Sequence, residues 1–153
     1  MRPVVVIPTR NEEKNLPNVL ADICNQTVDT DVVVVDGLSE DSTVKIAEDF
    51  GAKVVSLKSS VGWARHIGTL HAFSEYVLHT DADARLPTSW VERHINHLED
   101  YYIVTGPMLY KDDTPLSLIN PLYVVGQNIV MKSNITCAAA NLSFRKSKYV
   151  GFR

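Results

Sequence analysis

Two aspartates, Asp81 and Asp83, are the residues whose types and spacing are best suited to chemistry. They follow a short apolar run and are separated by one alanine. In an extended segment, residues i and i+2 point the same way, so both carboxylates can face one pocket. Hard divalent cations prefer oxygen ligands, and Mg²⁺ is commonly held by one or two carboxylates together with substrate phosphates. The pair therefore predicts a site for a metal diphosphate, although a lone aspartate pair is equally typical of a solvated turn.

Three other polar clusters also follow runs of β-branched residues. They cover residues 9–13, 36–41 and 59–66, and the aspartate pair begins a fourth cluster at residues 81–85. In open α/β sheets, ligands bind outside the carboxyl ends of the strands, where the connecting loops converge. The pattern predicts that the four clusters meet at one sheet edge, around a phosphate- or nucleotide-like ligand.

The elements that must position these clusters alternate between strand and helix. Strands are predicted at residues 4–7, 32–35, 53–57, 76–80 and 102–105. Helices are predicted at 17–25, from a cap at Ser39 or Asp41 to Phe50, at 63–73 and at 89–98. Such alternation is typical of βαβ units. We therefore predict an α/β fold, with a mainly parallel central sheet flanked by helices, as a single domain over residues 1–153.

Composition excludes several classes of protein. The chain has 153 residues, 45% hydrophobic and 22% charged, which is the balance of a folded domain. A net charge of -3 leaves no excess of Lys and Arg for a nucleic-acid backbone. No secretory signal opens the chain, and the longest apolar region, residues 116–131, is interrupted and shorter than the roughly 20 residues of a transmembrane helix. We expect a cytoplasmic protein.

Taken together, the motifs resemble those of family 2 glycosyltransferases of the GT-A, Rossmann-like fold. The matching segments are residues 7–13 (IPTRNEE), 34–43 (VVDGLSEDST), 62–68 (GWARHIG) and 80–83 (TDAD). Residues 139–146 (AANLSFRK), followed by Gly151 and Phe152, resemble the acceptor side of that family. The order and spacing of the segments also agree, so the resemblance covers nearly the whole chain.

The resemblance implies roles for individual residues. Asp36 would hydrogen-bond the base or ribose, although it also suits a turn before Gly37, where the family often has a second aspartate. Arg65 would lie near the nucleotide, with a surface helix residue as the alternative. Asp81 would contact the ribose, and Asp83, with Asp81, would hold Mn²⁺ or Mg²⁺. The full predicted nucleotide-sugar site comprises Pro8, Thr9, Arg10, Glu12, Asp36, Arg65, Asp81, Ala82 and Asp83.

The activity that the resemblance implies is metal-dependent transfer of a sugar from a UDP- or GDP-linked donor to a hydroxyl acceptor, with inversion. The acceptor could be a glycan, a lipid-linked molecule or a protein. Inverting relatives usually carry an acidic general base shortly after the Gly-Phe pair. Here only Arg153 follows that pair, so no catalytic residue is identified and we expect the chain to lack a C-terminal portion. A non-catalytic nucleotide-sugar-binding module is therefore an alternative.

A nucleotidyltransferase is the other alternative enzyme. Nucleotidyltransferases usually carry a Gly-rich basic loop after the first strand, and this chain has Pro8 to Glu12 there instead. The apolar region at residues 115–131 is predicted to be buried core; a surface that contacts a membrane or a lipid-linked acceptor is the alternative. Side chains expected to be structural or solvated are the free buried thiols Cys24 and Cys137, the packing residues Trp63, Trp90 and Tyr123, and His71, His94 and His97.

Overall fold

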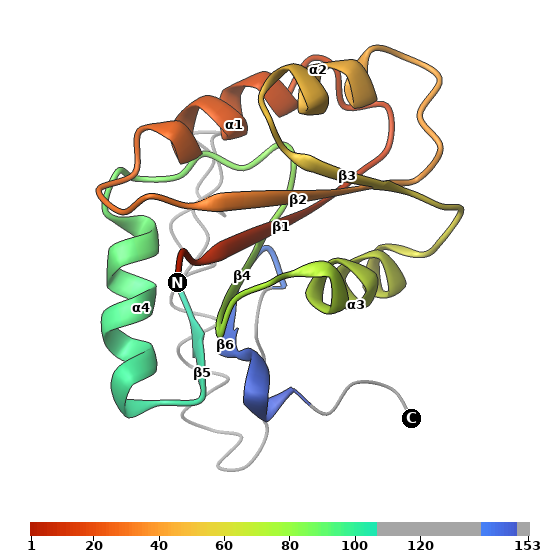
Figure 1. Ribbon diagram of the computed structural model, residues 1–153. Coiled ribbons are helices and arrows are strands. Elements are labelled where there is room, and N and C mark those ends of the chain that lie inside the picture. The colour runs from red at the N-terminus through yellow and green to blue at the C-terminus, as the bar shows by residue number, and fades with distance from the viewer. Residues whose placement is uncertain (107–138, 150–153) are drawn as a thin grey trace, which may run out of the picture.

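The computed structural model describes residues 1–106 and 139–149, which form a central sheet with helices on both faces (Figure 1). The strands are β1 (Val4–Thr9), β2 (Asp31–Asp36), β3 (Lys53–Ser56), β4 (Tyr76–Thr80), β5 (Ile103–Thr105) and β6 (Asn141–Arg145). The helices are α1 (Leu16–Cys24), α2 (Thr43–Asp49), α3 (Val61–His71) and α4 (Trp90–Asp100), and a short 3-10 helix, η1, covers Lys146–Lys148.

The six strands are arranged in the order β3-β2-β1-β4-β6-β5. The first four in this order are mutually parallel, which confirms the predicted mainly parallel sheet. β6 pairs antiparallel with both β4 and β5, so it separates two strands that are closer to each other in sequence. This insertion places Asn141 beside Thr80, immediately before the first aspartate of the pair.

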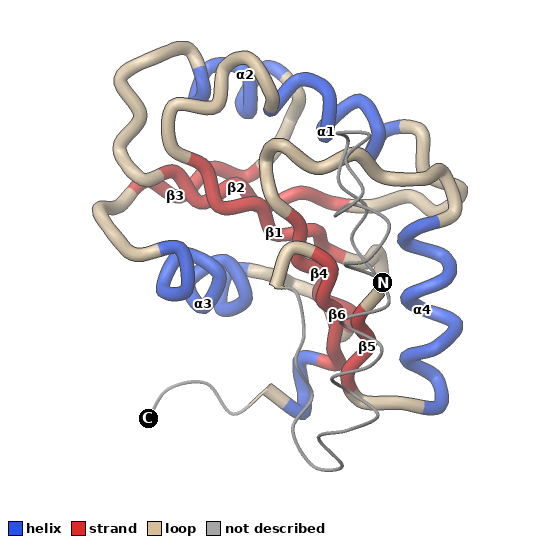
Figure 2. Tube along the Cα trace, turned by 180° about the vertical axis from the view of Figure 1, so that it is seen from behind, coloured by secondary structure: helices blue, strands red, loops and turns tan. Residues whose placement is uncertain are grey.

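Each face of the sheet has its own apolar core, because alternate residues of β1 point to opposite sides. Val5 and Ile7 pack with buried residues of α1, α2 and α4, including Leu16, Ala47 and Val91. Val4 and Val6 pack against α3 on the other face. Figure 2 shows the same division, with α3 on the opposite side of the strands from α1 and α2.

α3 approaches the sheet closely at Gly68. A Cβ atom added there would collide with the Cγ1 atom of Val6 and lie 3.0 Å from a methyl group of Val35. The helix begins at Val61 because the Ser60 side chain accepts a hydrogen bond from the Trp63 backbone N–H at 3.3 Å. This cap starts the helix two residues earlier than predicted and brings its first turn to the sheet edge.

One prediction about a buried side chain was wrong. Cys24 is a free but exposed thiol, because it ends α1 at the margin of the buried face formed by Leu16, Leu20 and Ile23. Trp63 is 44% exposed, and its ring packs against that of His66 with the ring centroids 4.9 Å apart.

Other predictions of structural roles were confirmed or fall outside the described residues. Trp90 is buried, and buried His94 contacts the Ser143 hydroxyl group with its Nδ1 atom at 2.7 Å. His71 is half-buried and His97 is exposed. Cys137, Tyr123 and the apolar region 115–131 lie outside the described residues. Within residues 1–106 and 139–149, none of the helices combines the length and the apolar character needed to cross a bilayer.

Candidate functional site

A cavity of about 460 Å³ lies at the carboxyl ends of β1, β2 and β4. It brings together eight of the nine residues predicted from sequence: Pro8, Thr9, Arg10, Glu12, Arg65, Asp81, Ala82 and Asp83. Asp36, the ninth, does not line it. The lining also includes Val35, which lies outside the predicted clusters, and four residues of those clusters that were not named as site residues: Gly37, Ser59, Val61 and Ala64.

The loops after β1 and β2 are hydrogen-bonded to each other on one side of the cavity. Asn11 adopts the left-handed conformation, with φ of 55°, and its side-chain Oδ1 accepts from the Glu40 backbone N–H at 2.9 Å. In return, the Asn11 N–H donates to the Ser39 hydroxyl at 2.8 Å. The Glu12 N–H donates to the Thr43 hydroxyl at 2.8 Å. These bonds fix the backbone of the segment that includes Arg10 and Glu12.

Asp41 is a second anchor between the same two loops. Its carboxylate accepts from the Glu13 N–H at 3.1 Å and from the Thr43 N–H at 2.9 Å. Desolvation raises the pKa of Asp41, but hydrogen bonds from the Thr43 side chain and the two N–H groups outweigh it, so the pKa lies below its usual value. The anchor is therefore ionised at neutral pH.

Asp36 ends β2 and is only 1% exposed. Its two carboxylate oxygens accept from the Ser39 hydroxyl at 2.5 Å and from the Ser39 N–H at 3.0 Å. This is the turn-forming role anticipated as the alternative, while a contact with a base or ribose stays a prediction. At Gly37, a Cβ atom would lie 3.2 Å from the Thr9 carbonyl oxygen, so the glycine keeps the two loops close.

The opposite side of the cavity is acidic and is contacted by α3. The Arg65 guanidinium, from the first turns of that helix, donates through Nη2 to Oδ1 of Asp81. The Arg65 side chain is 16% exposed and that of Asp81 is 36% exposed. Asp83 is exposed, so its carboxylate is open to a ligand.

Several buried polar atoms around the cavity lack a hydrogen-bond partner in the part of the chain that the structure describes. Among residues of the cavity lining, these atoms are Thr9 Oγ1, Ser59 Oγ and Arg65 Nε. A buried donor or acceptor without a partner is costly, by about 1–3 kcal/mol. A ligand rich in oxygen atoms, such as a diphosphate, would offset this cost.

The residues present also fit a divalent cation. Asp81 and Asp83 both line the cavity and offer hard oxygen donors. Within residues 1–106 and 139–149, no cluster of three or more His, Cys, Asp or Glu side chains could hold a metal by itself. The protein would therefore supply the two carboxylates, and the remaining ligands would come from substrate or water, as is usual for Mg²⁺.

His79, on β4 below the acidic loop, is a buried residue whose role sequence reasoning missed. Desolvation, followed by the nearby positive charge of Arg65, lowers its pKa to about 3, so the imidazole is neutral. The Thr69 hydroxyl donates to the Arg65 carbonyl oxygen at 2.9 Å and lies 3.1 Å from His79 Nε2. Because that hydroxyl has a single proton, it accepts from His79 Nε2–H. His79 thus ties β4 to the turn of α3 that carries Arg65.

Comparison with known families gives one match that spans most of the chain. The model described as glycosyl transferase family 2 matches residues 4–149. A curated relative, 4,4'-diaponeurosporenoate glycosyltransferase of Staphylococcus haemolyticus, is 30% identical over 144 residues, which covers 81% of this chain and 37% of the relative. The protein of the same name from Staphylococcus aureus (strain USA300) is 34% identical over 103 residues, which covers 62% of this chain and 28% of that relative. The chain thus spans well under half the length of these relatives.

Solved structures share the fold. A mannosyltransferase from Pyrobaculum calidifontis, in complex with GDP-Man and Mn²⁺, has a TM-score of 0.75 at 24% identity and covers 100% of this chain and 48% of its own. S. aureus TarS in complex with UDP has a TM-score of 0.65 at 25% identity, covering 75% and 38%. Glucosyl-3-phosphoglycerate synthase from Mycobacterium tuberculosis, with Mn²⁺ and UDP, has a TM-score of 0.70 at 17% identity, covering 95% and 57%.

Proposed function

The chain belongs to glycosyl transferase family 2, and from this premise we propose that its cavity binds a nucleotide-sugar donor for transfer to a hydroxyl acceptor. The observation that carries the proposal is that three separate segments, at the end of β1, in α3 and after β4, bring eight predicted site residues to one cavity. The donor is a UDP- or GDP-linked sugar, since the similar structures of TarS and the P. calidifontis enzyme hold UDP and GDP-Man.

The donor would lie across the cavity, with its nucleoside against the hydrogen-bonded loops after β1 and β2. Arg10 and Glu12 supply polar groups there, and the fixed backbone around them reduces the entropy lost on binding. The diphosphate would then point toward Asp81 and Asp83. Arg65 would donate to a phosphate oxygen, since a guanidinium is well suited to that contact.

Mn²⁺ or Mg²⁺ would be held by Asp83, with Asp81 as the second carboxylate. When bound there, the cation supplies Lewis-acid stabilisation of the charge that develops on the leaving nucleoside diphosphate. Asp83 is exposed and ready to bind, whereas Asp81 already accepts a hydrogen bond from Arg65. Asp81 would therefore be shared between the cation and the guanidinium.

Transfer with inversion requires a base that removes the proton from the acceptor hydroxyl. We assign no residue to this role. The curated relatives carry 4,4'-diaponeurosporenoate in their name, and this carboxylate would attack the sugar without loss of a proton, so it is the acceptor to test beside hydroxyl acceptors. Contact of residues 115–131 with a membrane is the alternative to the predicted buried core, and liposome flotation without enrichment of the protein would rule it out.

A thermal-shift panel of nucleoside diphosphates and their sugars, with and without Mn²⁺, tests the proposal. A ligand at 100 times its dissociation constant stabilises the folded state by about 2.7 kcal/mol, so the correct donor should raise the melting temperature measurably. Stabilisation by nucleoside triphosphates alone would favour the nucleotidyltransferase. Donor binding without any donor hydrolysis, measured on a chain as long as the relatives, would favour the non-catalytic module.

A further inference from the structure

The loop that carries the two aspartates has little backbone support of its own. It covers residues 81–89, between β4 and α4. The Ala84 N–H donates to the Asp81 carbonyl oxygen at 3.2 Å, and the Trp90 N–H donates to the Pro87 carbonyl oxygen at 2.9 Å. Arg85 and Leu86 lie between these two turns. A metal ligand needs a fixed position, so a loop of this kind depends on support from neighbouring elements.

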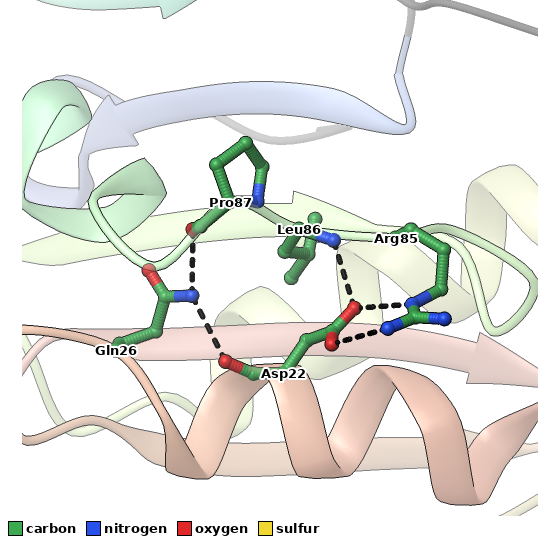
Figure 3. A network of polar contacts seen from close by, with 5 residues as sticks. All are labelled: Asp22, Gln26, Arg85, Leu86 and Pro87. Carbon is green, nitrogen blue, oxygen red and sulfur yellow. Dashed lines mark hydrogen bonds and ion pairs between the residues drawn. The ribbon is translucent and has the colours of Figure 1, made fainter.

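The carboxylate of Asp22, in α1, supplies that support (Figure 3). It accepts from Arg85 Nε at 2.7 Å, from Arg85 Nη2 at 2.9 Å and from the Leu86 N–H at 3.0 Å. The Asp22 side chain is 13% exposed and that of Arg85 is 69% exposed. Hydrogen bonding to Arg85 is the main reason that the pKa of Asp22 lies below its usual value. Asp22 is therefore ionised at neutral pH and binds the segment directly after Asp83.

The end of α1 continues this attachment along the loop. Gln26 donates through Nε2 to the carbonyl oxygens of Asp22 and Pro87, both at 2.9 Å (Figure 3). Its Oε1 accepts from the Val91 N–H at 3.0 Å. The Thr27 N–H donates to the Thr88 carbonyl oxygen at 2.9 Å. One helix end thus holds the chain from Arg85 to the start of α4, and Asp22 is its contact nearest in sequence to Asp83.

We propose that Asp22 is a positioning residue for the metal site, because it binds Arg85 and Leu86, which lie two and three residues after Asp83. The inference rests on the proposed function, since it concerns the metal end of the same cavity. Asp22 does not line the cavity, so it acts through the loop and not by touching the donor. Residues that orient metal ligands typically change metal affinity by about 10- to 100-fold when they are replaced.

The inference predicts a selective effect. In Asp22→Asn, an NH2 group takes the place of one of the two carboxylate oxygens. The NH2 group cannot accept the hydrogen bond that this oxygen accepts from the loop, so one attachment of the loop is lost. The tightening of nucleoside diphosphate binding by Mn²⁺ should then fall about 10-fold. Binding without Mn²⁺ should be unchanged, because the Asp22 carboxylate bonds Arg85 and Leu86, which belong to the loop after β4 and not to the loops after β1 and β2.

Titration calorimetry of UDP and GDP, with and without Mn²⁺, tests this on four proteins. They are the unaltered chain, Asp22→Asn, Arg85→Gln and Asp29→Asn. Arg85→Gln removes the exposed partner but leaves the Leu86 bond in place, so a smaller loss is expected. Asp29→Asn is the matched control, because Asp29 also pairs with an arginine, Arg2 at 3.3 Å, before the amino end of β2.

A loss of the Mn²⁺ effect in Asp22→Asn, with metal-free affinity and the control unchanged, supports the inference. An unchanged Mn²⁺ effect in Asp22→Asn, or an equal loss with and without Mn²⁺, overturns the inference alone. If Asp22→Asn does not fold, Arg85→Gln decides, and an unchanged Mn²⁺ effect there overturns it. If the unaltered chain binds neither nucleotide, the proposed function fails, and the inference fails with it.

Discussion

The two sides of the cavity are held in different ways. On the side proposed to hold the nucleoside, which we call the nucleoside side, the loops after β1 and β2 bond directly to each other, through pairs such as Asn11 with Glu40 and Glu12 with Thr43. On the acidic side, the loop after β4 is held by side chains from two helices, Arg65 of α3 and Asp22 of α1. These helices pack on opposite faces of the sheet. Nucleotide binding and metal binding should therefore respond to different substitutions.

The largest expected effect is that of Asp83→Asn on the acidic side. The amide removes the exposed anionic ligand, so Mn²⁺ should no longer tighten nucleoside diphosphate binding. The expected loss is about 100-fold, or about 2.7 kcal/mol, in the Mn²⁺-dependent part of the affinity. Titration calorimetry measures it, with metal-free binding as the internal control. Mn²⁺ that tightens binding equally in the variant would show that another group holds the cation.

Acid should destabilise the folded state through two buried histidines. Burial lowers the pKa of His79 to about 3 and is the main cause that lowers the pKa of His94 to about 4, against 6.5 for the free side chain. Below about pH 6.5 the unfolded chain binds these protons and the folded chain does not. The free energy of unfolding should therefore be highest above that pH. As the pH falls, it should decrease by about 1.4 kcal/mol per pH unit for each histidine. The decrease should end at about pH 4 for His94 and about pH 3 for His79.

Urea unfolding at several pH values between about 7.5 and 5 measures this slope. Asp22 and Asp41 do not contribute there, because a lowered aspartate pKa affects stability only at pH values near or below the ordinary aspartate pKa of 3.8. His94→Gln should reduce the slope by about half, since one of the two histidines is removed. A flat stability profile over this range would contradict the neutral, buried state of both rings.

Gly68→Ala should disturb the acidic side by displacing α3. The added Cβ would collide with Val6, and overpacking of a core typically costs about 1–3 kcal/mol. The matched control is Gly62→Ala in the same helix, where a Cβ would meet no atom within 4 Å. Urea unfolding should show a loss for Gly68→Ala and none for Gly62→Ala. Equal stabilities of the two variants would show that the helix is not in close contact with the sheet.

The smallest expected effect is on the nucleoside side. Asn11→Ala removes the side-chain oxygen that accepts the hydrogen bond from the Glu40 N–H. Alanine must then hold the left-handed conformation, with φ of 55°, without that bond, which costs about 1–2 kcal/mol. Metal-free nucleotide affinity should fall about fivefold, while the Mn²⁺ effect remains. Asn11→Gly, which tolerates this conformation, should lose less. Calorimetry that shows loss of the Mn²⁺ effect instead would mean that the two sides are not independent.

The sequence was sufficient to predict the features that follow from local patterns. Runs of β-branched residues located the strands, and the rule that loops converge at the carboxyl edge of a parallel sheet predicted that Asp81 and Asp83 would meet Thr9 and Arg65. The start of α3 was predicted two residues too late because the Ser60 cap was not recognised, so Val61 of the cavity lining was not placed in the helix.

Features that depend on contacts between distant residues could not be predicted from local patterns. Asp22 and Arg85 are 63 residues apart, and no spacing rule links an aspartate in α1 to a loop that follows five further elements. The position of β6 between β4 and β5 is also a choice among strand orders that the sequence pattern leaves open. Asp36 had two readings because a carboxylate can bind a ligand and form a turn with the same atoms.

A crystal structure of the protein with UDP or GDP and Mn²⁺ tests the central claim most directly, because anomalous scattering locates the manganese. We expect the metal between the Asp83 carboxylate and the diphosphate, with the nucleoside against residues 8–12. A nucleotide bound in this cavity with manganese away from both aspartates, or a nucleotide bound elsewhere, would contradict the account.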